Sequence, residues 1–124
     1  MIPIIFAAGF IFLAAFFNSC MDAFENTPNF DESIFKHLNK KWWCKDVSCN
    51  YVKTFLGYRP DAWHLSKTGM IFCFVGAVIS SVFAGMSGIA YGVNRFDVIA
   101  AITVLGIIWN GTFMLFYNLI FKIK

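Results

Sequence analysis

Charged side chains are scarce in this chain. Asp, Glu, Lys and Arg make up 14% of its 124 residues, whereas 59% of the residues are apolar. Soluble domains usually carry about 25% charged and about 45–50% apolar residues. So few charges cannot cover a globule, which excludes an ordinary soluble domain and predicts a surface that faces lipid. The net charge of +3 is small, and the long apolar runs contain no basic residue, so we expect no nucleic-acid partner.

Positive charge is missing from the start of the chain, where no Lys or Arg precedes Lys36. A cleaved signal peptide begins with a positively charged region, so this absence argues against one. The stretch from Ile2 to Met21 is nearly all apolar, and roughly 20 such residues cross a bilayer core. We therefore expect a first membrane span over about residues 2–21, followed by a polar loop over residues 22–59.

The four cysteines do not indicate a disulfide framework. Cys20 and Cys73 lie in or beside apolar runs, where cysteine commonly acts as a small hydrophobic residue. Cys44 and Cys49 lie in the polar loop, where they could pair, ligate a metal or stay reduced.

Two further apolar runs predict two more spans. The second is expected over about residues 60–92, with a polar head over residues 60–68. A helix of that length extends roughly 48 Å at about 1.5 Å per residue, more than a hydrocarbon core of about 30 Å, so the head should stand outside the lipid. The third span is expected over about residues 97–121. The predicted fold class is all-α, a single membrane domain over residues 1–124 with three transmembrane helices.

The polar loop carries its own helical pattern. Ile34, Leu38 and Trp42 recur at every fourth position, and lysines occupy the opposite side. This spacing predicts a short amphipathic helix. Two alternatives stay open: the helix lies on the membrane surface, or its apolar stripe packs onto the spans.

The distribution of Lys and Arg predicts the topology. Seven of them lie in the first loop and two in the C-terminal tail, against Arg95 alone on the other side. We therefore expect a multi-pass protein of the cell membrane, with its N-terminus outside and its long loop and C-terminus in the cytoplasm.

Small residues recur along the second span. One stripe consists of Gly76, Ser80, Ala84, Gly88 and Gly92. A parallel stripe consists of Cys73, Ala77, Ser81 and Gly85. Small residues at this spacing let membrane helices approach closely. The stripes predict packing against the first and third spans, or association with a second copy or another membrane protein.

Asn110 lies in the middle of the third span, where an amide needs a hydrogen-bond partner. We expect that partner on the second span, at Ser80, Ser81 or Ser87. A role in a pore or a substrate site is the alternative.

Polar residues at one end of the spans form the sharpest functional hypothesis. Under the predicted topology they share one layer at the cytoplasmic membrane surface: Asn18, Asp22, Asp61, His64 and Asn118. Asp22, Asp61 and His64 have the ligand types for a divalent metal such as zinc and could move protons, with Asn18 and Asn118 orienting a ligand. The alternative is a structural clamp, with His64 bonded to Asp22 and Asp61 capping its own helix.

A looser zinc site would combine the two loop cysteines with the two histidines: Cys44, Cys49, His37 and His64. Its Cys-x4-Cys spacing is long and its histidines are not paired. No other cofactor is expected from the sequence.

Several short motifs resemble a family of small, uncharacterised integral membrane proteins of bacteria and phages. The motifs are Phe17-Asn18-x-x-Met21-Asp22, Ser33-Ile34-Phe35, Trp42-Trp43, Asn50-Tyr51 and Asp61-x-Trp63-His64-Leu65-x-Lys67. The resemblance covers roughly residues 15–72 and implies that Asn18, Asp22, Asp61 and His64 belong together. Members of that family often carry a further His shortly after the Met-Asp pair. None occurs here between Phe24 and Phe30, which argues against a metal site in this chain.

Two functions are thus carried forward from the sequence. The first is a small integral membrane protein of a structural or interaction type, which packs through a small-residue helix face. The alternative is a metal-dependent hydrolase or transferase acting on a lipid or its headgroup at the cytoplasmic membrane surface.

Overall fold

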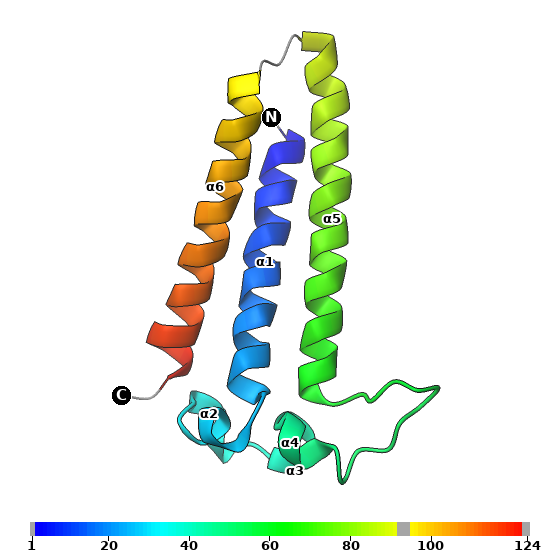
Figure 1. Cartoon of the computed structure of the whole chain (residues 1–124), viewed down its shortest axis with the longest axis vertical. Coiled ribbons are helices and arrows are strands. Elements are labelled where there is room, and N and C mark those ends of the chain that lie inside the picture. Colours follow the sequence, from blue (N-terminus) through cyan, green and yellow to red (C-terminus); the bar gives the residue numbers. More distant parts are fainter. Residues whose placement is uncertain (1, 92–94, 123–124) are drawn as a thin grey trace.

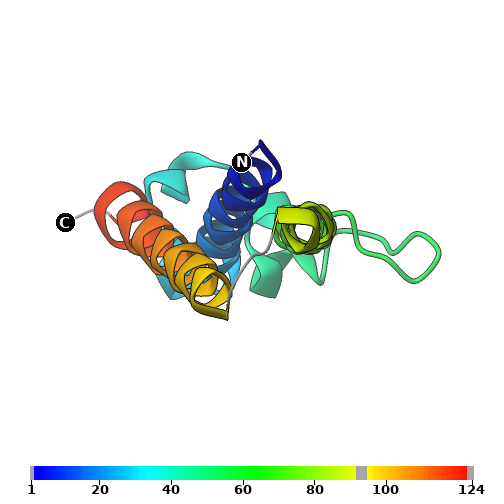
Figure 2. The same ribbon diagram turned by 90° about the horizontal axis from the view of Figure 1, so that it is seen from above.

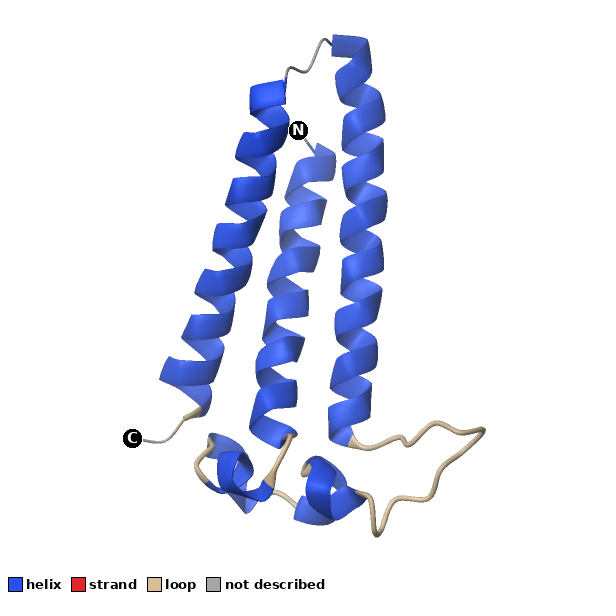
Figure 3. Ribbon diagram, in the orientation of Figure 1, coloured by secondary structure: helices blue, strands red, loops and turns tan. Residues whose placement is uncertain are grey.

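The computed structural model describes the backbone of residues 2–91 and 95–122, and the side chains of residues 4–85 and 98–122. Three long helices run side by side (Figure 1), and no strand element occurs among the described residues (Figure 3). They are α1 (Ile2–Phe24), α5 (Ala62–Tyr91) and α6 (Arg95–Met114), which continues as the π-helical segment η2 (Leu115–Phe121). The all-α fold predicted from the sequence is confirmed.

Each long helix contains a segment that is long and apolar enough to cross a membrane. These segments are Ile4–Phe24, Ala62–Gly85 and Val98–Phe121. The helices begin and end within a few residues of the predicted spans. The stripe position Gly92 lies outside the described residues, and the surroundings of Gly88 lie outside the described side chains.

Helix α1 lies between the other two helices, as the view from above shows (Figure 2). Its longest contact is with α5, where two phenylalanine rings of α1 fit over two glycines. A Cβ atom added to Gly76 would lie 2.8 Å from the Phe10 ring, and one added to Gly69 would lie 3.0 Å from the Phe17 ring. The small-residue face of α5 is therefore filled by aromatic side chains of α1, since only glycine leaves room for the rings.

Helix α6 packs on α1 and, among the described residues, makes few contacts with α5, one of which is a ring pair of Phe74 and Trp109. The Phe116 ring packs edge-on against Phe12 and Phe16 of α1, with centroids 5.9 and 4.9 Å apart. Of the two alternatives for the stripes, cover by the first and third spans is therefore incomplete along the second stripe. Cys73 and Ala77 of that stripe are buried, whereas Ser81 and Gly85 are exposed.

The loop between α1 and α5 does not form the single amphipathic helix that its stripe predicted. It contains four short helical segments: α2 (Thr27–Asp31), η1 (Ile34–His37), α3 (Lys40–Trp43) and α4 (Lys45–Ser48). Ser33 and Asn39 interrupt the helix because each has an extended backbone and a side-chain oxygen that accepts from a backbone N–H two residues ahead. Such local hydrogen bonds compete with a continuous helix.

The break also changes which side of the loop is buried. Ile34, Leu38 and Trp42, the predicted stripe, are exposed. Phe35 and Trp43 instead pack beneath the helices, with rings that stack 6.4 Å apart. They border a buried cluster at the lower end of the bundle: Cys20, Ala23, Phe24, Phe30, Cys44, Ala62 and Phe121. The loop thus forms a small folded base against the ends of all three spans.

Candidate functional site

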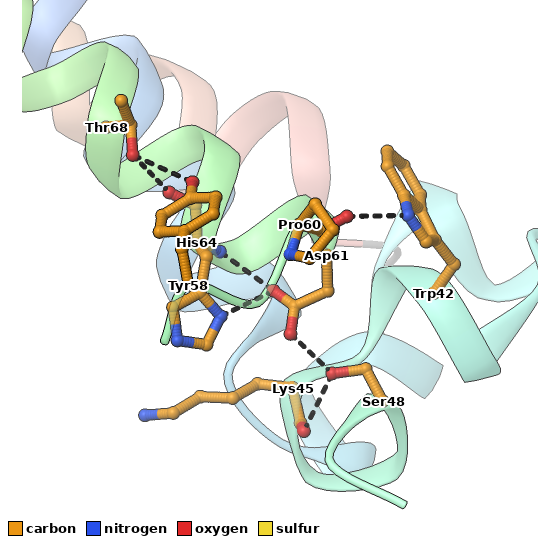
Figure 4. A network of polar contacts seen from close by, with 8 residues as sticks. All are labelled: Trp42, Lys45, Ser48, Tyr58, Pro60, Asp61, His64 and Thr68. Atoms are coloured by element: carbon orange, nitrogen blue, oxygen red, sulfur yellow. Dashed lines mark hydrogen bonds and ion pairs between the residues drawn. The ribbon is translucent and has the colours of Figure 1, made fainter. Parts of the chain in front are cut away.

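A buried carboxylate lies where the base meets α5. Asp61 is the last residue before that helix, and its side chain is 0% exposed. One carboxylate oxygen accepts from the backbone N–H of His64 at 2.9 Å and contacts the His64 ring Nδ1 at 2.8 Å. The other accepts from the Ser48 hydroxyl at 2.7 Å (Figure 4). Asp61 therefore caps α5 and ties it to α4, since a capping carboxylate satisfies a free N–H of the first helical turn.

Further hydrogen bonds hold the same junction (Figure 4). The Trp42 indole N–H donates to the Pro60 carbonyl at 2.9 Å, which joins α3 to the residue before the cap. The Tyr58 hydroxyl lies 2.8 Å from the Thr68 hydroxyl, which itself donates to the His64 carbonyl at 2.9 Å. Residues before and after the cap are therefore anchored to neighbouring elements, so the start of α5 is fixed from several directions.

Two lysines approach the Trp63 ring in the first turn of α5. Lys45 Nζ lies 4.0 Å from the ring centroid and Lys67 Nζ lies 5.2 Å from it. Lys45 also lies 4.0 Å from a carboxylate oxygen of Glu25, just after α1. These contacts place positive charge at the boundary of the span, where cation–π and headgroup interactions are both available.

The Asp61–His64 contact also fixes the orientation of the imidazole ring. With Nδ1 directed to the carboxylate, Nε2 is the nitrogen that remains for another partner, and no described residue bonds to it. Asp61 and His64 thus form a helix cap in which the His64 Nε2 atom has no partner among the described residues.

The structure does not join the other predicted site residues to this pair. Within residues 4–85 and 98–122, no hydrogen bond links Asn18, Asp22 or Asn118 to Asp61 or His64. The Asp22 backbone carbonyl accepts from the Asn29 side chain at 3.1 Å, Asn18 is half-buried, and Asn118 is exposed on η2. His64 pairs with Asp61 and not with Asp22, so that part of the predicted clamp is wrong.

Metal binding finds no support in this geometry. Among the described residues, no three His, Cys, Asp or Glu side chains come together closely enough to hold a metal ion. The hypothesis of a metal site on Asp22, Asp61 and His64 required both carboxylates beside the imidazole, and only one is there. The metal-dependent enzyme predicted as an alternative therefore lacks the joined Asp22, Asp61 and His64 ligands on which that prediction depended.

The cysteines are free and do not form the looser zinc site either. Cys44 is buried 3.9 Å from the Thr27 hydroxyl, and Cys49 is exposed, with its thiol 3.0 Å from the Asp46 carbonyl. The Cys44–Cys49 disulfide considered from the sequence is not formed.

Asn110 has the most unexpected position of the predicted residues. Its side-chain amide donates to the Gly106 carbonyl of its own helix at 2.9 Å, and the residue is exposed. The predicted hydrogen bond to Ser80 or Ser81 of α5 is therefore wrong, and the third predicted partner, Ser87, lies outside the described side chains. The opposite side of α6 is at least partly buried at Ala101, Ile108 and Thr112. Asn110 therefore lies on the side of α6 that points away from α1.

Sequence reasoning missed several residues of the junction, chiefly Ser48, Trp42 and Tyr58. Ser48 lies thirteen residues before its partner Asp61, in a segment without a helical pattern. No periodicity connects such a pair, so only the folded base reveals it. The exposed Trp42 gave a signal as part of the amphipathic stripe, but not for a hydrogen bond to Pro60.

Comparisons with protein-family models, curated proteins and solved structures find no match to this chain. The resemblance to small bacterial and phage membrane proteins stays a prediction.

Proposed function

We propose that this chain is a small integral membrane protein of a structural or interaction type, which associates with a second copy of itself through the outer face of α6. That face consists of Ile99, Thr103, Gly106, Asn110 and Met114. All five residues are exposed, and they follow one another at intervals of three or four positions. Such spacing aligns them along one side of a helix.

The observation that carries the proposal is the outward position of Asn110. It lies near the middle of the candidate span Val98–Phe121. A polar side chain facing lipid at that depth is unfavourable, whereas a hydrogen bond across two helices satisfies it. One amide hydrogen is used within α6, which leaves the carbonyl oxygen and the second N–H for a partner. Two copies of Asn110 across a two-fold axis would complement each other.

Gly106 supports the same face. A Cβ atom added there would meet nothing within 4 Å in the single chain, so a partner helix could approach closely. Small residues next to a polar one are a common composition of membrane helix interfaces. The exposed Ser81 and Gly85 of α5 form a second uncovered small surface, which is the competing interface for a second copy or another membrane protein.

We expect Asn110→Leu to weaken self-association about tenfold, since interhelical hydrogen bonds contribute roughly 0.6–2 kcal/mol in membranes. The measurement is energy transfer between differently labelled copies in vesicles, titrated over the protein-to-lipid ratio. Asn110→Gln, which keeps the amide, should retain most of the association. Gly85→Leu on α5 is the control and should leave it unchanged. If Gly85→Leu disrupts association and Asn110→Leu does not, the interface lies on α5 and the proposal is wrong.

We further propose that the base and the C-terminus lie in the cytoplasm and the N-terminus outside, on the charge distribution described above. Cys49 provides a direct test because it is the exposed cysteine of the base, whereas Cys20, Cys44 and Cys73 are buried. A membrane-impermeant maleimide should leave intact cells unlabelled and label the protein once the membrane is permeabilised. Cys49→Ser should abolish that labelling. Labelling of Cys49 in intact cells would reverse the topology.

A further inference from the structure

A tight turn in the loop between α4 and α5 combines an unfavourable backbone conformation with exposed apolar side chains. The backbone N–H of Phe55 donates to the Tyr58 carbonyl at 2.7 Å, and that of Tyr58 donates to the Phe55 carbonyl at 2.9 Å. Between them, Leu56 has φ = +50° and Gly57 has φ = +79°. Positive φ at both central residues is the pattern of a type I′ turn, where Asn or Gly is favoured at the first position and leucine is not.

The same turn exposes its apolar side chains. Leu56 is 92% exposed and Phe55 is 73% exposed, among the most exposed large apolar residues of the chain. Leucine at this position therefore carries an unfavourable backbone conformation and gains no contact within the protein. Two adjacent apolar side chains exposed at one turn form a surface that a partner outside the chain can cover.

The turn lies beside the end of α5 at which its candidate span begins. Figures 1 and 2 show the loop between α4 and α5 extending sideways from the bundle, and Figure 1 shows it returning to the height of the first turns of α5. The Tyr58 hydroxyl bonds to Thr68, and the Tyr58 ring packs edge-on against His64 with centroids 6.0 Å apart. Thr68 lies about 9 Å along the helix axis from Ala62, where the candidate span begins. The root of the turn is thus fixed beside the first turns of α5.

Positive charge flanks the turn on both sides. Lys53 precedes it and Arg59 follows it, and in the part of the chain that the structure describes neither side chain forms an ion pair. The Nε atom of Arg59 is buried and its N–H has no acceptor among the described residues, so the guanidinium would reach phosphate oxygens through its terminal amino groups.

We propose that the turn Phe55–Tyr58 inserts into the boundary between headgroups and acyl chains of the same bilayer that the three helices cross. Phe55 and Leu56 contact the parts of the acyl chains next to the headgroups, while Lys53 and Arg59 bind the phosphates of anionic headgroups. A cationic border around an apolar tip is the composition of peripheral membrane anchors. In this chain the anchor would hold the base against the membrane surface and fix its rotation about α5.

The test places a fluorescent label on Leu56→Cys in a Cys49→Ser background, which removes the exposed native thiol. The labelled protein is reconstituted into phosphatidylcholine vesicles with and without phosphatidylglycerol. The matched control carries the label on Lys36→Cys, an exposed position of η1 in the same base. Quenching is measured with a nitroxide on the upper acyl chain and, separately, with iodide in the water.

Insertion predicts that the acyl-chain nitroxide quenches the label at position 56 more than iodide does, with the reverse order at position 36. Removing phosphatidylglycerol should reduce the nitroxide quenching at position 56. Iodide quenching at position 56 equal to that at position 36 would show a turn in water and overturn the proposal. A label at position 56 that neither quencher reaches would be covered by protein, which also overturns it. An unchanged signal without phosphatidylglycerol would overturn the assigned roles of Lys53 and Arg59.

Discussion

Replacing Asp61 with alanine should lower the free energy of unfolding by about 2–4 kcal/mol. Loss of an N-cap side chain costs about 0.5–2 kcal/mol, and each buried group left without its partner costs about 1–3 kcal/mol. Asp61→Ala removes the cap of α5 and leaves the His64 backbone N–H without its acceptor, while the Ser48 hydroxyl keeps only the Lys45 carbonyl at 3.1 Å. The measurement is reversible unfolding in mixed detergent micelles, followed by circular dichroism.

The matched control for this variant is Asp31→Ala. Asp31 pairs with Lys40 at 2.6 Å, but both side chains are well exposed, and such surface pairs contribute at most about 1 kcal/mol. Ser48→Ala should have an intermediate effect, and combined with Asp61→Ala it should add little, because both changes break one hydrogen bond. Equal losses for Asp31→Ala and Asp61→Ala would show that the buried cap does not stabilise the base.

Half of this junction was visible in the sequence. Pro60 followed by Asp61 marks a helix start, and Asp61 and His64 are spaced one helical turn apart, so local rules place them together. The structure shows this cap. Ser48 and Trp42 escaped prediction because they reach the junction through the fold of the base, which depends on the packing of Phe30, Phe35 and Trp43. No local rule describes that packing.

Two of the predictions failed because polar groups found partners other than the expected ones. The continuous loop helix was predicted from the spacing of its apolar residues, and the interhelical hydrogen bond from the need of Asn110 for a partner. Ser33 and Asn39 satisfied their own neighbouring backbone groups and broke the loop helix. Asn110 satisfied one N–H within α6 and faced outward. Sequence shows that a polar group requires a partner, but not whether the partner belongs to the same chain.

The glycines of α5 show which helix contact the spacing of small residues predicted correctly and which it did not. Small residues at every fourth position predicted a close helix contact, and the Gly76 position has one, with Phe10 of α1. The same pattern continues to Gly85 on the neighbouring stripe, where a Cβ atom would meet nothing within 4 Å. The spacing is alike at both sites, so only the position of α1 distinguishes a filled surface from an open one.

This difference predicts a large effect of Gly76→Val. A valine would place its Cβ atom 2.8 Å from the Phe10 ring and add two methyl groups beyond it, so the Phe10 ring must shift or α1 and α5 must separate. Overfilling a packed contact costs about 1–3 kcal/mol, and the contact between α1 and α5 is the most extensive one between the spans. We expect a corresponding loss of stability in the same detergent unfolding measurement, together with faster proteolysis of the base.

Gly85→Val is the matched control, because it makes the same exchange in the same helix at an open site. Any cost of valine in a helix is common to both variants, so the difference between them measures packing alone. Phe10→Ala should restore part of the stability lost in Gly76→Val, since it removes the ring that the valine displaces, and the coupling in that double-mutant cycle should be favourable. Equal stability of the Gly76→Val and Gly85→Val proteins would mean that Phe10 and Gly76 are not in contact in the folded protein. The α1–α5 contact would then need a different register.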